Sequence, residues 1–183
     1  PGFGDRLDCF RRLALVSWRL RGMKAVLVPM RWHDADETFA QKYARAAEMI
    51  KQQQAKKVVI IGESAGGAMV MALLEKYAHR FAAVVTVCGY NHDADKIGAK
   101  YRMRNPAFFD AVSAADMAVA SLPTVFKKKM YVLFTPSDVT VKQEHSHIAG
   151  VSSVTIPGYT HMGAIARFLI CPQNSTFTLR RDE

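Results

Sequence analysis

The run from Lys57 to Gly67 constrains the fold more than any other part of the chain. Its letters, KVVIIGESAGG, are an apolar β-branched stretch entering Gly-x-Ser-x-Gly, and an Ala-, Met- and Leu-rich stretch follows over 68–77. This order predicts a buried strand, a tight turn at Ser64 and then a helix. Gly62 and Gly66 would let strand and helix pass closely, and the serine backbone would be strained. A flexible Ser/Gly loop is the alternative, and the flanking pattern argues against it.

The length and composition bound the class of protein. The 183 residues suit one domain, 1–183, with 50% hydrophobic and 22% charged residues, as in soluble globular proteins. The longest apolar runs have strand length, so no membrane span is predicted. The separated Cys9, Cys88 and Cys171 are interpreted as small buried hydrophobes in a reducing compartment. With no secretory pattern at the start, we expect a cytoplasmic location.

The net charge of +9 raises the question of a nucleic-acid or anionic-membrane partner. The distribution of the basic residues argues against such a partner, because they precede predicted strands or sit at carboxyl ends of predicted helices. A parallel sheet would gather these positions at the edge opposite Ser64, as a solvated basic rim. They are Lys24, Lys51, Lys56, Lys57, Lys76, His79, Arg80, Lys127, Lys128 and Lys129.

Predicted strands and helices alternate along the chain. This alternation predicts parallel βαβ units, hence a three-layer α/β/α sandwich around a mainly parallel sheet. Segment 90–128 is longer than one crossover helix needs, so it is either a small cap over the carboxyl edge of the sheet or an ordinary crossover with a long loop. Strands are expected at 24–30, 57–62, 82–88, 130–135 and 152–156, and helices at 8–20, 37–54 (capped by Asp34 or Asp36), 65–78 and 162–170.

A serine hydroxyl is a poor nucleophile near neutral pH and needs a base that is oriented by an acid. Asp138 follows one predicted strand and His161 follows the next. Both would therefore leave the carboxyl edge at which Ser64 stands, and the order Ser, Asp, His is the one that accompanies this elbow. Alternatively, Asp138 caps a turn or helix and His161 is a surface residue. The combination with the elbow favours a catalytic triad.

Other residues compete for these roles. The acids Asp93 and Asp95, with His92, follow the preceding strand and could also reach the base. His145 and His147 are expected at the surface, and His33 could line a pocket. No cluster of His, Cys, Asp or Glu has metal-ligand spacing, so no metal is predicted, and no glycine pattern indicates a nucleotide cofactor.

Acyl transfer also requires two N–H donors for a developing oxyanion. The N–H of Ala65, directly after the nucleophile, is the first candidate. The second is the N–H of Phe3 in Pro1-Gly2-Phe3-Gly4, a loop that would enter a helix. An unattached flexible terminus is the alternative for this loop.

The chain resembles the α/β-hydrolases. The resemblance rests on the elbow 62–67, on Asp138 and His161 after the last two strands, and on Pro1-Gly2-Phe3-Gly4, which is similar to the family's His-Gly-x-Gly loop with Pro1 in place of histidine. The family's loop follows a central strand for which this chain has no residues. Either amino-terminal strands are lacking, which we favour, or strand 24–29 pairs directly with 57–62.

The expected activity is that of a serine hydrolase that cleaves a carboxylic ester or related acyl bond of a small molecule, without a cofactor. A non-catalytic ligand-binding protein on the same scaffold is the alternative. Residues expected to contact the substrate are Phe3, Trp32, Glu63, Tyr90, Tyr159 and Met162, joined by Phe108 and Phe109 if segment 90–128 folds over the site.

Overall fold

Four parallel strands form the centre of the molecule. The computed structural model describes every residue except 4–7, 34–35, 56, 159 and 172–183. The strands are β1 (Val58–Glu63), β2 (Phe81–Val87), β3 (Met130–Phe134) and β4 (Ser152–Thr155), paired in the order β1-β2-β3-β4. Strands that are all parallel require crossovers, and helices supply them on both faces. The predicted three-layer α/β/α architecture is therefore confirmed.

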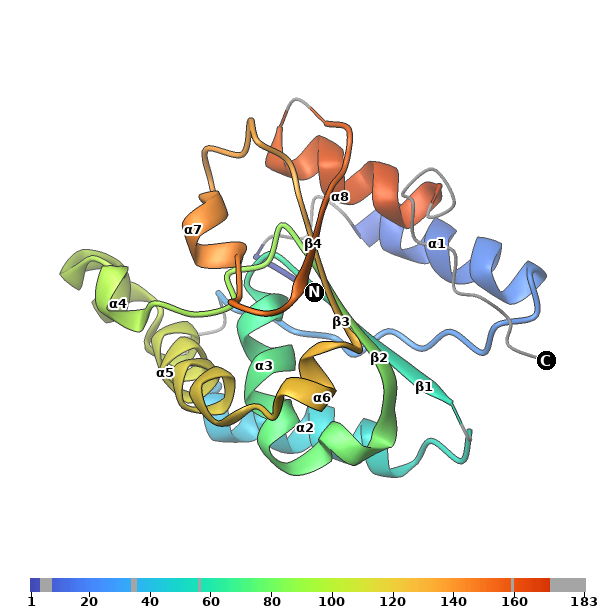
Figure 1. Cartoon of the computed structure of the whole chain (residues 1–183), viewed down its shortest axis with the longest axis horizontal. Helices are drawn as coiled ribbons and strands as arrows, with labels where there is room; N and C mark the ends of the chain where they lie inside the picture. The colour runs from blue at the N-terminus through green and yellow to red at the C-terminus, as the bar shows by residue number, and fades with distance from the viewer. Residues whose placement is uncertain (4–7, 34–35, 56, 159, 172–183) are drawn as a thin grey trace.

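Two sets of helices cover the two faces of the sheet (Figure 1). The helices α1 (Asp8–Leu20) and α8 (His161–Ile170) pack together on one face. The other face carries α2 (Phe39–Lys51), α3 (Gly66–Tyr77) and α5 (Pro106–Ser121), with α6 (Thr124–Lys127) at its side. Short turns of helix complete the chain: Ala78–Arg80, Ala94–Lys96, α4 (Ala99–Arg104) and α7 (Gln143–Ser146).

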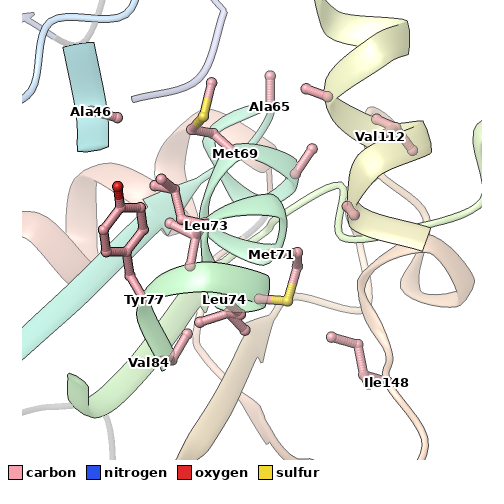
Figure 2. Close-up of a cluster of buried hydrophobic side chains, with 14 of the residues drawn as sticks. Ala46, Ala65, Met69, Met71, Leu73, Leu74, Tyr77, Val84, Val112 and Ile148 are labelled. Carbon is pink, nitrogen blue, oxygen red and sulfur yellow. The ribbon is translucent and has the colours of Figure 1, made fainter. Parts of the chain in front are cut away.

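Each face of the sheet has its own apolar core, because successive strand residues point to opposite sides. On β2, Val84 belongs to the core under α3, whereas Val85 and Val87 belong to the core under α1 and α8. Helix α3 is apolar and buried between α2 and α5 along most of its length, with Glu75 and Lys76 exposed near its end. Figure 2 shows its side chains between Ala46 of α2 and Val112 of α5.

The predicted strand 24–30 is wrong. These residues form an irregular segment in which Met30 is buried but Val26 is 43% exposed. A strand needs a partner for its backbone groups, and among the described residues nothing pairs with the outer edge of β1. The alternative that this segment pairs directly with β1 is therefore also wrong.

Helix α2 begins at a cap that the sequence interpretation missed. Thr38 Oγ1 accepts the Gln41 N–H at 3.3 Å, and the Gln41 side chain in turn accepts the Thr38 N–H at 2.8 Å. The helix is therefore capped by Thr38 in a reciprocal capping box and not by the predicted Asp36. The other predicted cap, Asp34, lies outside the described residues. The apolar side of the helix faces the core, with Ala46, Ala47 and Ile50 buried and Phe39 and Tyr43 partly buried against them.

The cysteine prediction holds for one residue of three: Cys88 is buried, whereas Cys9 and Cys171 are exposed. Their positions explain the difference, since Cys88 follows a central strand and the other two lie on or just after outer helices. Within the described residues, none of the helices is long and apolar enough to span a membrane.

Segment 90–128 folds as consecutive helices. Its longest helix, α5, packs against α3 as a crossover helix does. The shorter α4 precedes it and brings Tyr101 within 5.8 Å of the Phe3 ring, measured between ring centroids. The segment thus reaches the loop that contains Phe3.

Candidate active site

Ser64 stands on the sharp turn between β1 and α3. Its φ is +51°, a left-handed conformation that a residue with a side chain adopts only under constraint. Gly62 permits this turn, because a Cβ there would lie 2.6 Å from the Gly66 carbonyl oxygen. The Ser64 N–H donates to the Val87 carbonyl at 3.1 Å, which fixes the turn against the end of β2. The predicted strand, strained turn and helix are all present.

His161 and Asp138 lie beside this serine. His161 Nε2 is 2.9 Å from Ser64 Oγ, and His161 Nδ1 is 2.6 Å from Asp138 Oδ2. A carboxylate only accepts hydrogen bonds, so the Nδ1–H donates to Asp138, and Nε2 of the neutral ring is left to accept the serine O–H. All three residues are at most 9% exposed. The structure therefore brings together the three residues that the sequence analysis singled out.

Local structure holds the acid and the base in place. Asp138 Oδ1 accepts the N–H groups of Thr140 at 2.8 Å and Val141 at 2.9 Å. His161 is the first residue of α8, whose cap, Thr160, accepts the Gly163 N–H at 3.1 Å. Asp138 after β3 is therefore held by hydrogen bonds to its own loop, and His161 after β4 by the start of a capped helix.

The electrostatics favour an ionised Asp138. Burial alone would raise its pKa, but hydrogen bonds from His161 and from the Val141 and Thr140 N–H groups outweigh burial and lower the pKa below the usual value. Asp138 is therefore negatively charged at neutral pH. It can stabilise a positive charge on the His161 ring.

The loop 1–3 lies against the nucleophile. A Cβ at Gly2 would fall 2.4 Å from Ser64 Cβ and 3.0 Å from Ser64 Oγ, so the backbone of this loop runs directly beside the hydroxyl. The Trp32 indole N–H donates to the Pro1 carbonyl at 3.0 Å and ties the loop down. On the other side of the serine, Ala65 begins the turn into α3.

A family model for the α/β hydrolase fold matches residues 28–144, more than half of the chain and including the elbow and Asp138. The chain belongs to the α/β-hydrolase family. No curated protein sequence matches it.

Solved structures of α/β-hydrolases share the fold at low sequence identity. An extracellular α/β-hydrolase from a Paenibacillus species is 14% identical with a TM-score of 0.61, over 89% of this chain and 92% of that one. A provisionally assigned hydrolase from Agrobacterium vitis S4 is 13% identical with a TM-score of 0.60, over 94% and 81%. The esterase domain of a Rhodothermus marinus protein is 14% identical with a TM-score of 0.52, over 77% and 68%. At such identities the likeness concerns the fold alone, and the chemistry depends on the residues of the site.

Aromatic residues gather next to the loop of this α/β-hydrolase that contains Phe3. The Phe108 ring of α5 is 5.1 Å from Phe3, 5.6 Å from Trp32 and 5.6 Å from Tyr90, measured between centroids. Three predicted substrate-contact residues therefore lie in one cluster with Phe108. Tyr101 of α4 joins it 5.9 Å from Phe108. Sequence reasoning missed Tyr101, which only tertiary packing brings to Phe3.

The remaining predicted substrate contacts do not join this cluster. The carboxylate of Glu63 pairs with the guanidinium of Arg11 from α1, and both side chains are buried. Met162 packs against the core between α8 and the sheet. Phe109 lies under the Arg102 guanidinium, 4.5 Å from the ring centroid. Tyr159 lies outside the described residues.

Three of the competing residues, Asp93, His92 and His145, contact one another rather than the triad. Asp93 Oδ2 is 3.2 Å from His145 Nδ1, and the His145 ring stacks on Tyr90 at 4.7 Å. His92 Nδ1 lies 3.1 Å from Asp93 Oδ1, so this acid already has two histidine partners. His145 is buried, which corrects the prediction of a surface position. Its helix, α7, packs against the loop after β2, because the His145 carbonyl accepts the Asn91 N–H at 2.9 Å.

One group among the described residues has the donor atoms to hold a metal ion: Cys88, Asp138 and His161, with their ligand atoms within 4.8 Å of one another. Burial, and secondly the charge and hydrogen bonding of Asp138, raise the pKa of Cys88 to about 12. The sulfur is therefore a thiol near neutral pH, whereas metals bind the thiolate. With Cys88 protonated, these three residues suit a hydrogen-bonded site better than a metal centre. Cys88 is a neighbour of the triad that sequence reasoning did not identify.

Proposed function

We propose that this α/β-hydrolase is a serine hydrolase that cleaves a carboxylic ester or a related acyl bond of a small molecule through an acyl-enzyme. The observation that carries the proposal is the continuous hydrogen-bonded chain from Ser64 Oγ through His161 to Asp138. Hydroxyl, imidazole and carboxylate in this order are the parts that acyl transfer requires.

Each residue has a role that follows from its contacts. His161 Nε2, 2.9 Å from Ser64 Oγ, takes the hydroxyl proton as the oxygen attacks the carbonyl carbon. Asp138 keeps the proton of His161 on Nδ1 and stabilises the imidazolium that results. The imidazolium then returns its proton to the leaving alcohol. Water then attacks the acyl-enzyme while His161 accepts its proton. The acid is released, and the proton passes from His161 to Ser64 Oγ.

Charge that develops on the carbonyl oxygen needs donors that are already in position. Ala65 directly follows Ser64 in the chain, and the loop 1–3 runs beside the serine hydroxyl. We assign the oxyanion to the N–H groups of Ala65 and Phe3. Phe3 and Tyr90 are partly exposed rings that pack on the buried Phe108 next to this loop. We assign to them the contact with an apolar acyl or alkyl part of the substrate. Esters with a larger apolar acyl or alkyl group should therefore react faster than methyl acetate.

Labelling with a fluorophosphonate probe tests the proposal. The wild-type chain should react at Ser64, identified by peptide mass spectrometry, and Ser64→Ala should lose both labelling and ester hydrolysis by at least about 10⁴-fold. Ser152→Ala, at an exposed serine of β4, is the matched control and should react as the wild type does. A folded wild type that binds an ester without labelling or turnover would favour the non-catalytic binding protein instead.

A further inference from the structure

Cys88 is held in an unusual position directly behind the proposed catalytic acid. It is the first residue after β2, is fully buried and has φ +48°. Its N–H donates to the Leu133 carbonyl of β3 at 2.7 Å. A left-handed conformation at a residue with a side chain costs free energy and persists only where the surroundings impose it. Here it turns the chain so that the side chain points toward the loop of Asp138.

The contacts of the thiol distinguish Cys88 from the other cysteines. Its sulfur, a carboxylate oxygen of Asp138 and a ring nitrogen of His161 all lie within 4.8 Å of one another. Cys9 and Cys171 are exposed. The raised pKa of Cys88 keeps its proton in place at neutral pH, so the group facing Asp138 is an S–H, a weak hydrogen-bond donor.

We propose that Cys88 is a positioning residue of the triad: its S–H donates to the Asp138 carboxylate, holds it behind His161 and weakens its pull on the imidazole proton. The inference rests on the proposed function, since it concerns the same three residues. It adds a donor to the two N–H groups, of Thr140 and Val141, that already bind Asp138 Oδ1. Each donor withdraws negative charge from the carboxylate.

The charge on Asp138 determines in which direction loss of the thiol moves the protonation of His161. Without the thiol, Asp138 carries more negative charge toward His161, and the imidazole takes up its proton at a higher pH. Because a neutral His161 is needed to accept the serine proton, the acid limb of the pH–rate profile should move to higher pH. A weak hydrogen bond corresponds to a displacement of about half a pH unit.

The experiment compares Cys88→Ala, which lacks the donor, with Cys88→Ser, which keeps one. The rate of fluorophosphonate labelling at Ser64 is measured from pH 5 to 9, and the His161 ring is titrated in parallel by NMR. We expect Cys88→Ala to raise both midpoints by about half a unit and to slow labelling several-fold, whereas Cys88→Ser matches the wild type or lies below it. Cys9→Ala, at an exposed cysteine, is the matched control and should change neither midpoint.

The outcomes separate the inference from the proposed function. Identical midpoints in the wild type and Cys88→Ala, with wild-type thermal stability, would overturn the inference while labelling of Ser64 still stood. If the wild type is not labelled, the proposed function fails, and the NMR titration of His161 still decides whether the thiol acts on Asp138. If Cys88→Ala does not fold, Cys88→Ser decides: a hydroxyl is the stronger donor, so an upward shift of its midpoint would contradict the proposal.

Discussion

Nδ1 of His161 lies 2.6 Å from Oδ2 of Asp138, although the two residues follow different strands and are 23 positions apart. This contact sets the tautomer of the imidazole: the carboxylate can only accept a hydrogen bond, so Nδ1 carries the ring proton. It also aims Nε2 at Ser64, 97 positions earlier in the chain. The chemistry proposed for the serine therefore depends on an acid that does not touch it.

Replacing that acid should abolish most of the activity without unfolding the protein. Asp138→Asn keeps an oxygen for the N–H groups of Thr140 and Val141 but presents an amide to His161, which favours the wrong tautomer. By analogy with triads in general, the labelling rate at Ser64 should fall by about 10⁴-fold. Labelling kinetics and circular dichroism measure the two properties. A loss of less than tenfold would show that another group orients His161.

Gly2 should be intolerant of any side chain. A Cβ there would lie 2.4 Å from Ser64 Cβ, so Gly2→Ala must displace either loop 1–3 or the nucleophile. We expect labelling of Ser64 to fall by at least about 100-fold, as for loss of an oxyanion donor. Gly98→Ala is the matched control, because a Cβ at Gly98 meets nothing within 4 Å. Equal labelling rates in the two variants would contradict the assignment of this loop.

The buried pair of Arg11 and Glu63 should stabilise the helix α1 against the elbow. Arg11→Met leaves the Glu63 carboxylate buried without this partner, and breaking such a pair typically costs about 3–5 kcal/mol of unfolding free energy. The double variant Arg11→Met/Glu63→Gln should recover much of this loss in urea unfolding. Glu63→Gln also tests the predicted substrate contact: an unchanged KM would remove Glu63 from the substrate-binding residues.

Glu37 should make the stability of the protein depend on pH in the acid range. The hydrogen bond from Arg45, aided by Lys42 and opposed by burial, lowers the pKa of Glu37 to about 2. A carboxyl whose pKa is lower in the folded state stabilises the protein above its unfolded pKa, 4.5, and loses that contribution as the pH falls toward 2. Urea unfolding at pH 5, 4 and 3 should therefore show a steeper loss for the wild type than for Glu37→Gln. Parallel pH dependences would refute this linkage.

Much of the fold followed from local patterns. The β-branched run before Ser64 and the small residues after it predicted β1, the turn and α3, because a glycine-bounded serine between a strand and a helix has few other conformations. The alternation of strands and helices predicted the parallel sheet, because the periodicity of apolar residues in each segment indicates its secondary structure. Asp138 and His161 could be selected because every parallel strand ends at the same edge.

Other features depended on contacts between distant segments. A run of apolar residues at 24–30 has the composition of a strand, yet a strand forms only where a neighbour accepts its backbone hydrogen bonds. Tyr101 reaches Phe3 through the packing of α4 and α5, which no periodicity encodes. His145 is buried for a similar reason, since its ring stacks on Tyr90 from another loop.

The sequence by itself determined the four parallel strands, the elbow and the three side chains that meet there, because these follow from local backbone preferences and the direction of parallel strands. Only the tertiary structure decided what surrounds them: the thiol of Cys88 behind Asp138, Arg11 against Glu63 and the aromatic cluster beside Phe3. Such neighbours depend on side-chain packing across the interior, which residue spacing along the chain does not specify.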